Sequence, residues 1–76
     1  MKPTVRQLQL LKIIQEYITE YGYPPSRREL AIRLEVSSTN TIQGMLAILR
    51  MHGLIHYDRS IARSISVTAT GKELLA

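Results

Sequence analysis

Apolar residues recur at helical spacing in the first third of the chain. They are Leu10, Leu11, Ile14, Tyr17, Ile18 and Tyr21. Because an α-helix turns once every 3.6 residues, these positions share one face, and they predict an amphipathic helix over residues 4–22. Thr4 and Gln7 have capping-box spacing at its start, and Gly22 stands where a left-handed C-terminal cap belongs. The two prolines that follow prevent the helix from continuing.

Two shorter helical patterns come next. Ser26 and Glu29 form a second capping box, which predicts a helix over residues 26–35. Ser37 or Ser38 is expected to cap a third helix over residues 38–52. Its apolar face consists of Ile42, Met45, Leu46 and Leu49. The turn between these two helices is only a few residues long, as in a helix-turn-helix.

The period of the pattern changes after the third helix. Residues 54–57 and 63–67 alternate between apolar and polar, which predicts two strands joined by a loop over residues 58–62. A two-stranded hairpin over residues 54–67 that follows a helix-turn-helix is the wing of a winged helix. The fold class is therefore mainly α with a small β-hairpin, a winged helix-turn-helix of three helices.

The end of the chain completes a single domain. Thr68 can cap a short C-terminal helical turn over residues 68–76 that carries Leu74 and Leu75. We find no linker or internal repeat, so one domain over residues 1–76 is expected. A chain of this length buries only about 60% of its unfolded surface, and its core must be economical.

Composition narrows the class of protein. The chain is 45% hydrophobic, which is too much for a disordered tail, and it has no cysteine for disulfides or thiolate metal sites. No run of 18 apolar residues and no signal peptide are present, so we expect a cytoplasmic protein without a membrane partner. Ten Lys and Arg against six Asp and Glu leave a net charge of +4, which favours an anionic partner.

Catalytic and metal-binding chemistry has little support. His52 and His56 are four residues apart, but Gly53 interrupts the helix between them and no cysteine completes a tetrahedral zinc site. Asp58 and the glutamates are scattered, and no activating base accompanies the serines at 37–38. We therefore expect no enzyme, no metal, no cofactor and no small-molecule ligand.

Many residues between positions 4 and 67 carry a resemblance to a known family. They are Thr4-Val5-Arg6-Gln7, Gly22-Tyr23-Pro24-Pro25-Ser26, Glu29-Leu30-Ala31, Leu34, Ser38, Asn40, Leu46, Leu49, Gly53-Leu54-Ile55 and Arg63-Ser64-Ile65. In these residues the chain resembles the DNA-binding domain of the LexA family of repressors. The resemblance implies that a homodimer binds operator DNA, with the third helix in the major groove and the wing near the backbone or the minor groove.

The resemblance also assigns base contacts to the start of the third helix. The family's positions fall here on Ser38, Asn40, Thr41, Gln43 and Gly44. The chain departs from the family at Glu35, where a glycine is usual, and at Gln43 and Gly44, where an acidic pair is usual. We therefore expect an operator that differs from the family's usual one.

The outward face of the third helix supports a role in base reading. At 100° per residue, it presents Asn40, Gln43, Gly44, Ala47, Arg50 and Met51. Asn and Gln side chains can bond adenine bidentately, and the methyl groups of Thr and Ala suit thymine, so this face favours A·T pairs. Gly44 costs helix stability, and its lack of a side chain could let the helix lie deep in the groove.

Phosphate contacts need cationic side chains, hydroxyls or helix N-termini. The candidates are Ser26, Arg27, Arg28, Thr39, Arg50, Arg59 and Arg63. They lie at the start of the second helix, at both ends of the third and in the wing. Each arginine alone could serve solubility, but together they flank the outward face of the third helix.

The leading hypothesis is a bacterial or phage regulator, a LexA-like repressor associated with the nucleoid, that binds double-stranded DNA at a palindromic operator. The spare apolar residues, Leu8, Ile61, Leu74 and Leu75, could supply a homodimer contact. The 76 residues leave no room for the family's second domain, which cleaves itself through a Ser–Lys pair, so no self-cleavage is expected. Two alternatives stay open: a winged-helix protein–protein interaction module, and the isolated DNA-binding fragment of a longer repressor.

Overall fold

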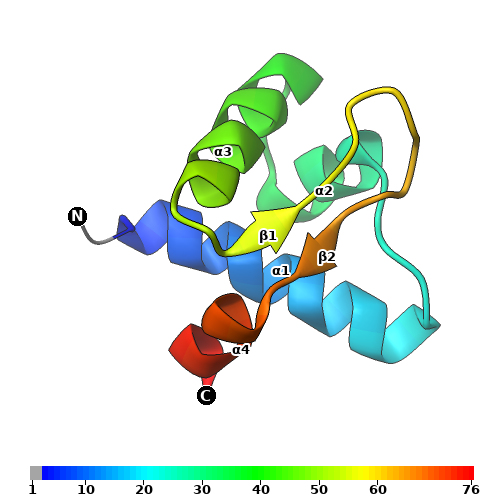
Figure 1. Cartoon of the computed structure of the whole chain (residues 1–76). Helices are drawn as coiled ribbons and strands as arrows, with labels where there is room; N and C mark the ends of the chain where they lie inside the picture. The colour runs from blue at the N-terminus through cyan, green and yellow to red at the C-terminus, as the bar shows by residue number, and fades with distance from the viewer. Residues whose placement is uncertain (1–2) are drawn as a thin grey trace.

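Four helices and a two-stranded hairpin follow one another in the computed structural model, which describes residues 3–76. The elements are α1 (Val5–Tyr21), α2 (Arg27–Leu34), α3 (Thr39–Met51), β1 (Ile55–His56), β2 (Ser66–Val67) and α4 (Ala69–Leu75) (Figure 1). The first two residues of the domain expected over 1–76 lie outside the described part. Within residues 3–76, no helix is both long and apolar enough to cross a membrane.

Side chains close to each helix start determine where the helices begin. Thr4 and Gln7 form both hydrogen bonds of a capping box on α1, and Ser26 and Glu29 do the same on α2. Ser38, rather than its neighbour, caps α3, because its hydroxyl accepts the Asn40 N–H at 3.1 Å. Each cap satisfies an amide that the helix itself leaves unpaired, so these boundaries follow from local sequence.

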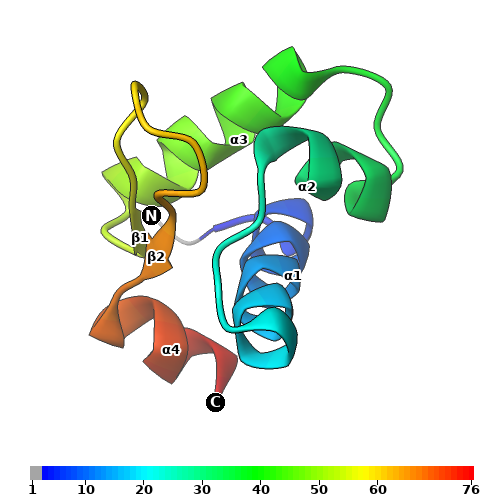
Figure 2. The ribbon, with the colours of Figure 1, turned by 90° about the vertical axis from the view of Figure 1, so that its right-hand side faces the viewer.

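The core lies where the three main helices meet the hairpin. Its fully buried side chains come from α1, α2, α3, β1 and the residue just before β2: Leu10, Leu11, Ile14, Leu30, Leu34, Ile42, Leu46, Leu49, Ile55 and Ile65. These are the apolar positions of the helical and strand patterns, and their burial supplies most of the favourable free energy of folding. Helix α1 lies against both α2 and α3, which form the opposite end of the molecule from α4 (Figure 2).

The hairpin is shorter than the alternation predicts. Only Ile55 pairs with Val67 and His56 with Ser66, so the strands expected over residues 54–57 and 63–67 shrink to two residues each. The hydroxyl of Ser64 accepts from the Asp58 N–H and donates to the Asp58 carbonyl, both at 2.9 Å, in place of ladder bonds. Arg63 adopts a positive φ of 56°, which ends the extended conformation of its arm.

The C-terminal turn is a seven-residue helix that packs closely on the base of the hairpin. Thr68 caps α4 and also donates its hydroxyl to the Gly53 carbonyl at 2.7 Å. Gly71 is buried, and a Cβ there would collide with the Leu54 carbonyl and lie 2.8 Å from Val67 Cγ1. Only glycine allows α4 to come this close to Leu54 and Val67. Because α4 also contacts α1, it holds the base of the hairpin close to α1.

Candidate nucleic-acid interface

The outward face of α3 exposes small polar side chains. Asn40, Thr41, Gly44 and Ala47 are exposed, and Gln43 is half-buried. Ser38 precedes the first residue of α3, and its hydroxyl caps the helix by accepting the Asn40 N–H. Among residues 3–76, no side-chain or backbone atom outside the helix lies within 4 Å of a Cβ placed on Gly44. Asn40, Gln43, Gly44 and Ala47 therefore share one accessible face of α3, and Ser38 and Thr41 lie beside it at the start of the helix.

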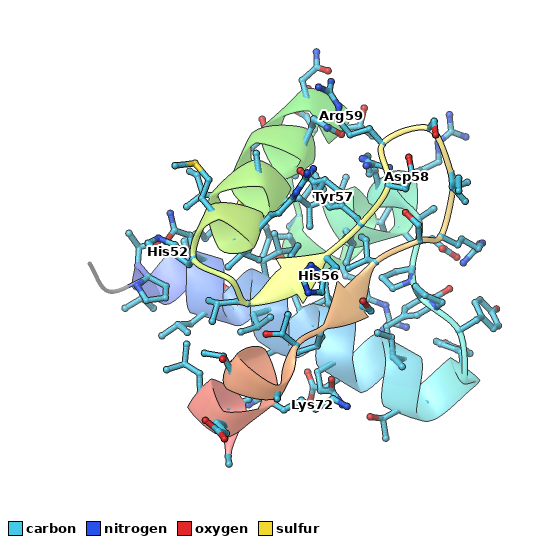
Figure 3. The ribbon with its side chains drawn as sticks, in the orientation of Figure 1. His52, His56, Tyr57, Asp58, Arg59 and Lys72 are labelled. Carbon is cyan, nitrogen blue, oxygen red and sulfur yellow. The ribbon has the colours of Figure 1, made fainter. Side chains whose placement is uncertain are left out.

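A groove separates this face from the hairpin loop. It holds about 500 Å³ and is lined by Gln43, Gly44, Ala47, Arg50, Met51, Tyr57 and Arg59. Tyr57 and Arg59 reach it from the hairpin (Figure 3). One wall therefore carries candidate base-reading residues and the other carries basic and aromatic side chains, which suits an anionic polymer.

Tyr57 is a site residue that the sequence did not single out. Two guanidinium groups lie over its ring, with the Cζ of Arg27 5.5 Å and that of Arg50 5.1 Å from the ring centre. Such cation–π contacts hold long side chains in place. The alternation of apolar and polar residues along the first arm could have identified it. Ile55 is buried, His56 is exposed and Tyr57 is again partly buried, so its ring lies on the same side of the hairpin as Ile55.

Arg27 connects α2 to α3 instead of extending into solvent. Its Nε donates a short hydrogen bond to the Gln43 Oε1. Its Nη2 is buried and has no hydrogen-bond partner among the residues that the structure describes. Part of this guanidinium group is therefore shielded from water. Arg27 holds the groove wall in place and offers little free charge to a ligand.

Arg63 is also held within the molecule. Its Nη1 lies 2.8 Å from Glu29 Oε1 and donates to the Pro24 carbonyl at 3.1 Å, and its Cζ lies 5.0 Å from the centre of the Tyr23 ring. The second arm of the hairpin is thereby fastened to the start of α2. The charge of Arg63 is largely balanced there, although the sequence had offered it as a phosphate contact.

Glu29 is the centre of this attachment. Its carboxylate accepts from the Ser26 N–H at 2.8 Å and from the Tyr17 hydroxyl at 2.7 Å, besides pairing with Arg63. These hydrogen bonds, the one from Ser26 above all, lower the pKa of Glu29 from 4.5 to about 2. The hydrogen bond between Tyr17 and Glu29 also raises the pKa of Tyr17, because the Tyr17 hydroxyl donates to a carboxylate. One ionised side chain thus joins α1, α2 and the hairpin.

Of the remaining candidate phosphate ligands, Arg50 and Arg59 line the groove. Arg28 and Arg59 are exposed, Thr39 is exposed at the first turn of α3, and Ser26 is half-buried because it caps α2. Asp58 lies beside Arg59 in the loop. Hydrogen bonds from Ser60, together with the positive charge of Arg50, lower the pKa of Asp58.

The two histidines lie apart in the structure. His52 ends α3 and His56 lies on β1, and Figure 3 shows their side chains at separate places. Across residues 3–76, no group of three or more His, Cys, Asp or Glu side chains is arranged to hold a metal ion.

Comparison with known proteins agrees with this geometry. The family model of the LexA DNA binding domain matches residues 1–64. The LexA repressor of Enterococcus faecalis is 44% identical over 68 residues, which cover 90% of this chain and 32% of that protein. The LexA repressors of Oenococcus oeni and Bacillus licheniformis are 40% and 38% identical, over 92% and 96% of this chain and 33% and 35% of theirs. The chain thus spans about a third of the length of these relatives, and it belongs to the LexA DNA-binding domain family.

Proposed function

We propose that the chain is the DNA-reading part of a transcriptional repressor, with α3 lying in the major groove of double-stranded DNA. The observation that carries the proposal is the exposed face of α3, where small polar side chains border a basic groove. An α-helix fits the major groove, and only there do all four base pairs present distinct hydrogen-bonding patterns. Ser38, Asn40, Thr41, Gln43, Gly44 and Ala47 are the proposed base-contacting residues.

Phosphate contacts on both sides would orient the helix. Arg28 and the N-terminus of α2 with Ser26 suit one backbone, and Thr39, Arg50 and Arg59 are the other proposed ligands. Arg63 and Arg27 serve in this proposal mainly by holding the hairpin and the groove wall, because Arg63 pairs with Glu29 and the Nε of Arg27 donates to Gln43. Backbone contacts fix the position of a protein on DNA but do not by themselves specify sequence.

The repressor role, the palindromic operator and the homodimer belong to the proposal as well. The names of the relatives, LexA repressors, support a role in repression. We propose that this part of the chain acts without catalysis, in the cytoplasm and on the nucleoid. A domain this small contacts one half-site, and two copies read a palindrome. Leu74 on α4 is 46% exposed and is a candidate for the contact between copies.

Binding-site selection from random duplex DNA tests the proposal. We expect a palindromic motif, and Asn40→Ala should weaken binding to it by about 1–3 kcal/mol while changing binding to random DNA much less. An equal loss on both kinds of DNA would mean that Asn40 reads no base. No enriched motif would overturn the proposal in favour of a protein partner.

The homodimer is tested separately on the selected site. Leu74→Asp should reduce the cooperativity of binding to the full palindrome and leave half-site binding unchanged. Ile32→Asp is the matched control, because Ile32 is a 70% exposed apolar residue on α2. Cooperativity that survives Leu74→Asp would place the contact between copies elsewhere.

A further inference from the structure

We infer that Arg27 decides which base Gln43 reads, by fixing the orientation of the Gln43 side-chain amide. The inference rests on the proposed function, because it assumes that α3 enters the major groove. It concerns a residue of α2 that lies outside the outward face of the reading helix.

The contact itself determines the orientation. Arg27 Nε is a donor only, and it donates to Gln43 Oε1, so the carbonyl end of the amide points toward α2. The other end of the amide, the NH₂ group, is then the end left to face the groove that Gln43 lines. A hydrogen bond from a charged donor is stronger than one between neutral groups, so this orientation is preferred before DNA arrives.

Arg27 is itself held in place. Its guanidinium lies over the ring of Tyr57, which Arg50 covers as well. Its Nη2 is buried, so protein and not solvent encloses that end of the guanidinium group. The side chain is therefore pinned between α2, α3 and the hairpin, and it cannot swing away freely to let the amide turn.

The fixed amide changes the base that Gln43 prefers. A free glutamine pairs with adenine by using its oxygen and its NH₂ group together. Because the hydrogen bond from Arg27 turns the oxygen toward α2, Gln43 presents its NH₂ donor to the DNA. A donor suits guanine, because guanine shows two acceptors, N7 and O6, in the major groove. Gln43 is thus expected to favour guanine, whereas the sequence pattern alone favoured A·T pairs.

The experiment compares binding motifs selected by the wild type and by variants of the 76-residue chain. Gln43→Ala first identifies the operator position that Gln43 reads, as the position where the base preference disappears. At that position, the wild type should prefer guanine to adenine by about tenfold, in the range of one good base contact. Arg27→Ala should shift the preference toward adenine, because the freed amide can then use both of its ends.

Matched controls separate this effect from charge and from stability. Arg28→Ala removes the same charge from an exposed neighbour, and it should weaken binding without altering the base preference. In a Gln43→Ala background, Arg27→Ala should cause no further change in preference. Loss of stability alone would lower the amount of folded protein and would leave the preferred base unchanged.

Each outcome decides a different claim. If the wild type selects no motif, the proposed function fails and this inference fails with it. If a motif appears but Gln43→Ala affects no position, or Arg27→Ala keeps the wild-type preference, only the inference is overturned. An adenine preference in the wild type at the Gln43 position would also overturn it.

Discussion

Glu35 adopts a left-handed backbone conformation, with φ 60° and ψ 41°, at the end of α2. A residue with a Cβ is strained there by about 1 kcal/mol or more, whereas glycine is not. This conformation explains why a glycine suits the turn between α2 and α3. The short turn is maintained here at a cost to stability.

Glu35→Gly should therefore raise the free energy of unfolding by about 1 kcal/mol. Urea denaturation followed by circular dichroism measures the change. Glu35→Ala is the control, since it removes the carboxylate and keeps the strained Cβ. Equal effects of the two substitutions would show that charge, and not backbone strain, is the cause.

At Gly71 the lack of a side chain matters because of space, and not because of backbone conformation. Gly71→Ala should lower the free energy of unfolding by about 1–3 kcal/mol, because its Cβ would be forced against the Leu54 carbonyl and Val67. Gly44→Ala has open space around it and should instead stabilise α3 by about 0.5–1 kcal/mol. Denaturation curves of both variants check this contrast, and a stable Gly71→Ala protein would contradict the close packing of α4.

At the scale of elements, the attachment of the hairpin to α1 and α2 through Glu29 makes stability depend on pH. The pKa of Glu29 in the folded state, about 2, lies below its ordinary value of 4.5, so folding favours the ionised form. The resulting stabilisation is fully present above pH 4.5 and is lost as pH falls toward 2. The protein should therefore become less stable as this carboxylate is protonated.

Thermal unfolding at a series of pH values tests this expectation. The wild-type Tm should fall between pH 5 and 2, which is the window set by the two pKa values (~4.5 and ~2). Glu29→Gln should start from a lower Tm at neutral pH and show a flatter dependence. Glu73→Gln, on an exposed residue of α4, should follow the wild-type curve. A Glu29→Gln curve parallel to the wild type would argue against this attachment.

At the scale of the whole molecule, basic side chains gather at the end that carries α2, α3 and the hairpin loop. Six arginines lie on α2, α3 and the hairpin loop against three acidic residues, Glu29, Glu35 and Asp58, whereas α1 and α4 together hold three basic and three acidic residues. The net charge of +4 is thus distributed unevenly. A polyanion is expected to approach the α3 end.

The salt dependence of DNA binding tests whether the uneven distribution of charge matters for binding. The logarithm of the DNA-binding constant should fall with the logarithm of salt concentration, with a slope of about −0.9 for each phosphate contacted. Arg28→Ala should reduce the magnitude of the slope by about 0.9, and Lys72→Ala, on α4, should leave it unchanged. Equal effects of the two variants would indicate a diffuse attraction without specific phosphate contacts.

Much of this architecture could be predicted because its causes are local. Thr4 with Gln7 and Ser26 with Glu29 are three residues apart, so the capping boxes could be read directly from the sequence. Helical periodicity identified the buried face of α3 and therefore its outward face. The lengths of the strands were wrong, because Ser64 and Arg63 replace the ladder by contacts that alternation does not encode.

The sequence by itself determined the helices, the caps of α1, α2 and α4, the order of elements and the outward face of α3, whereas it left the cap of α3 open between Ser37 and Ser38. These depend on residues within one or two turns of each other. Only the tertiary structure decided what the arginines do. Arg27 meets Gln43 across 16 positions and Arg63 meets Pro24 across 39, and no periodicity links residues so far apart. Which guanidinium is free and which is held depends on how the helices and the hairpin pack, because packing alone brings such distant partners together.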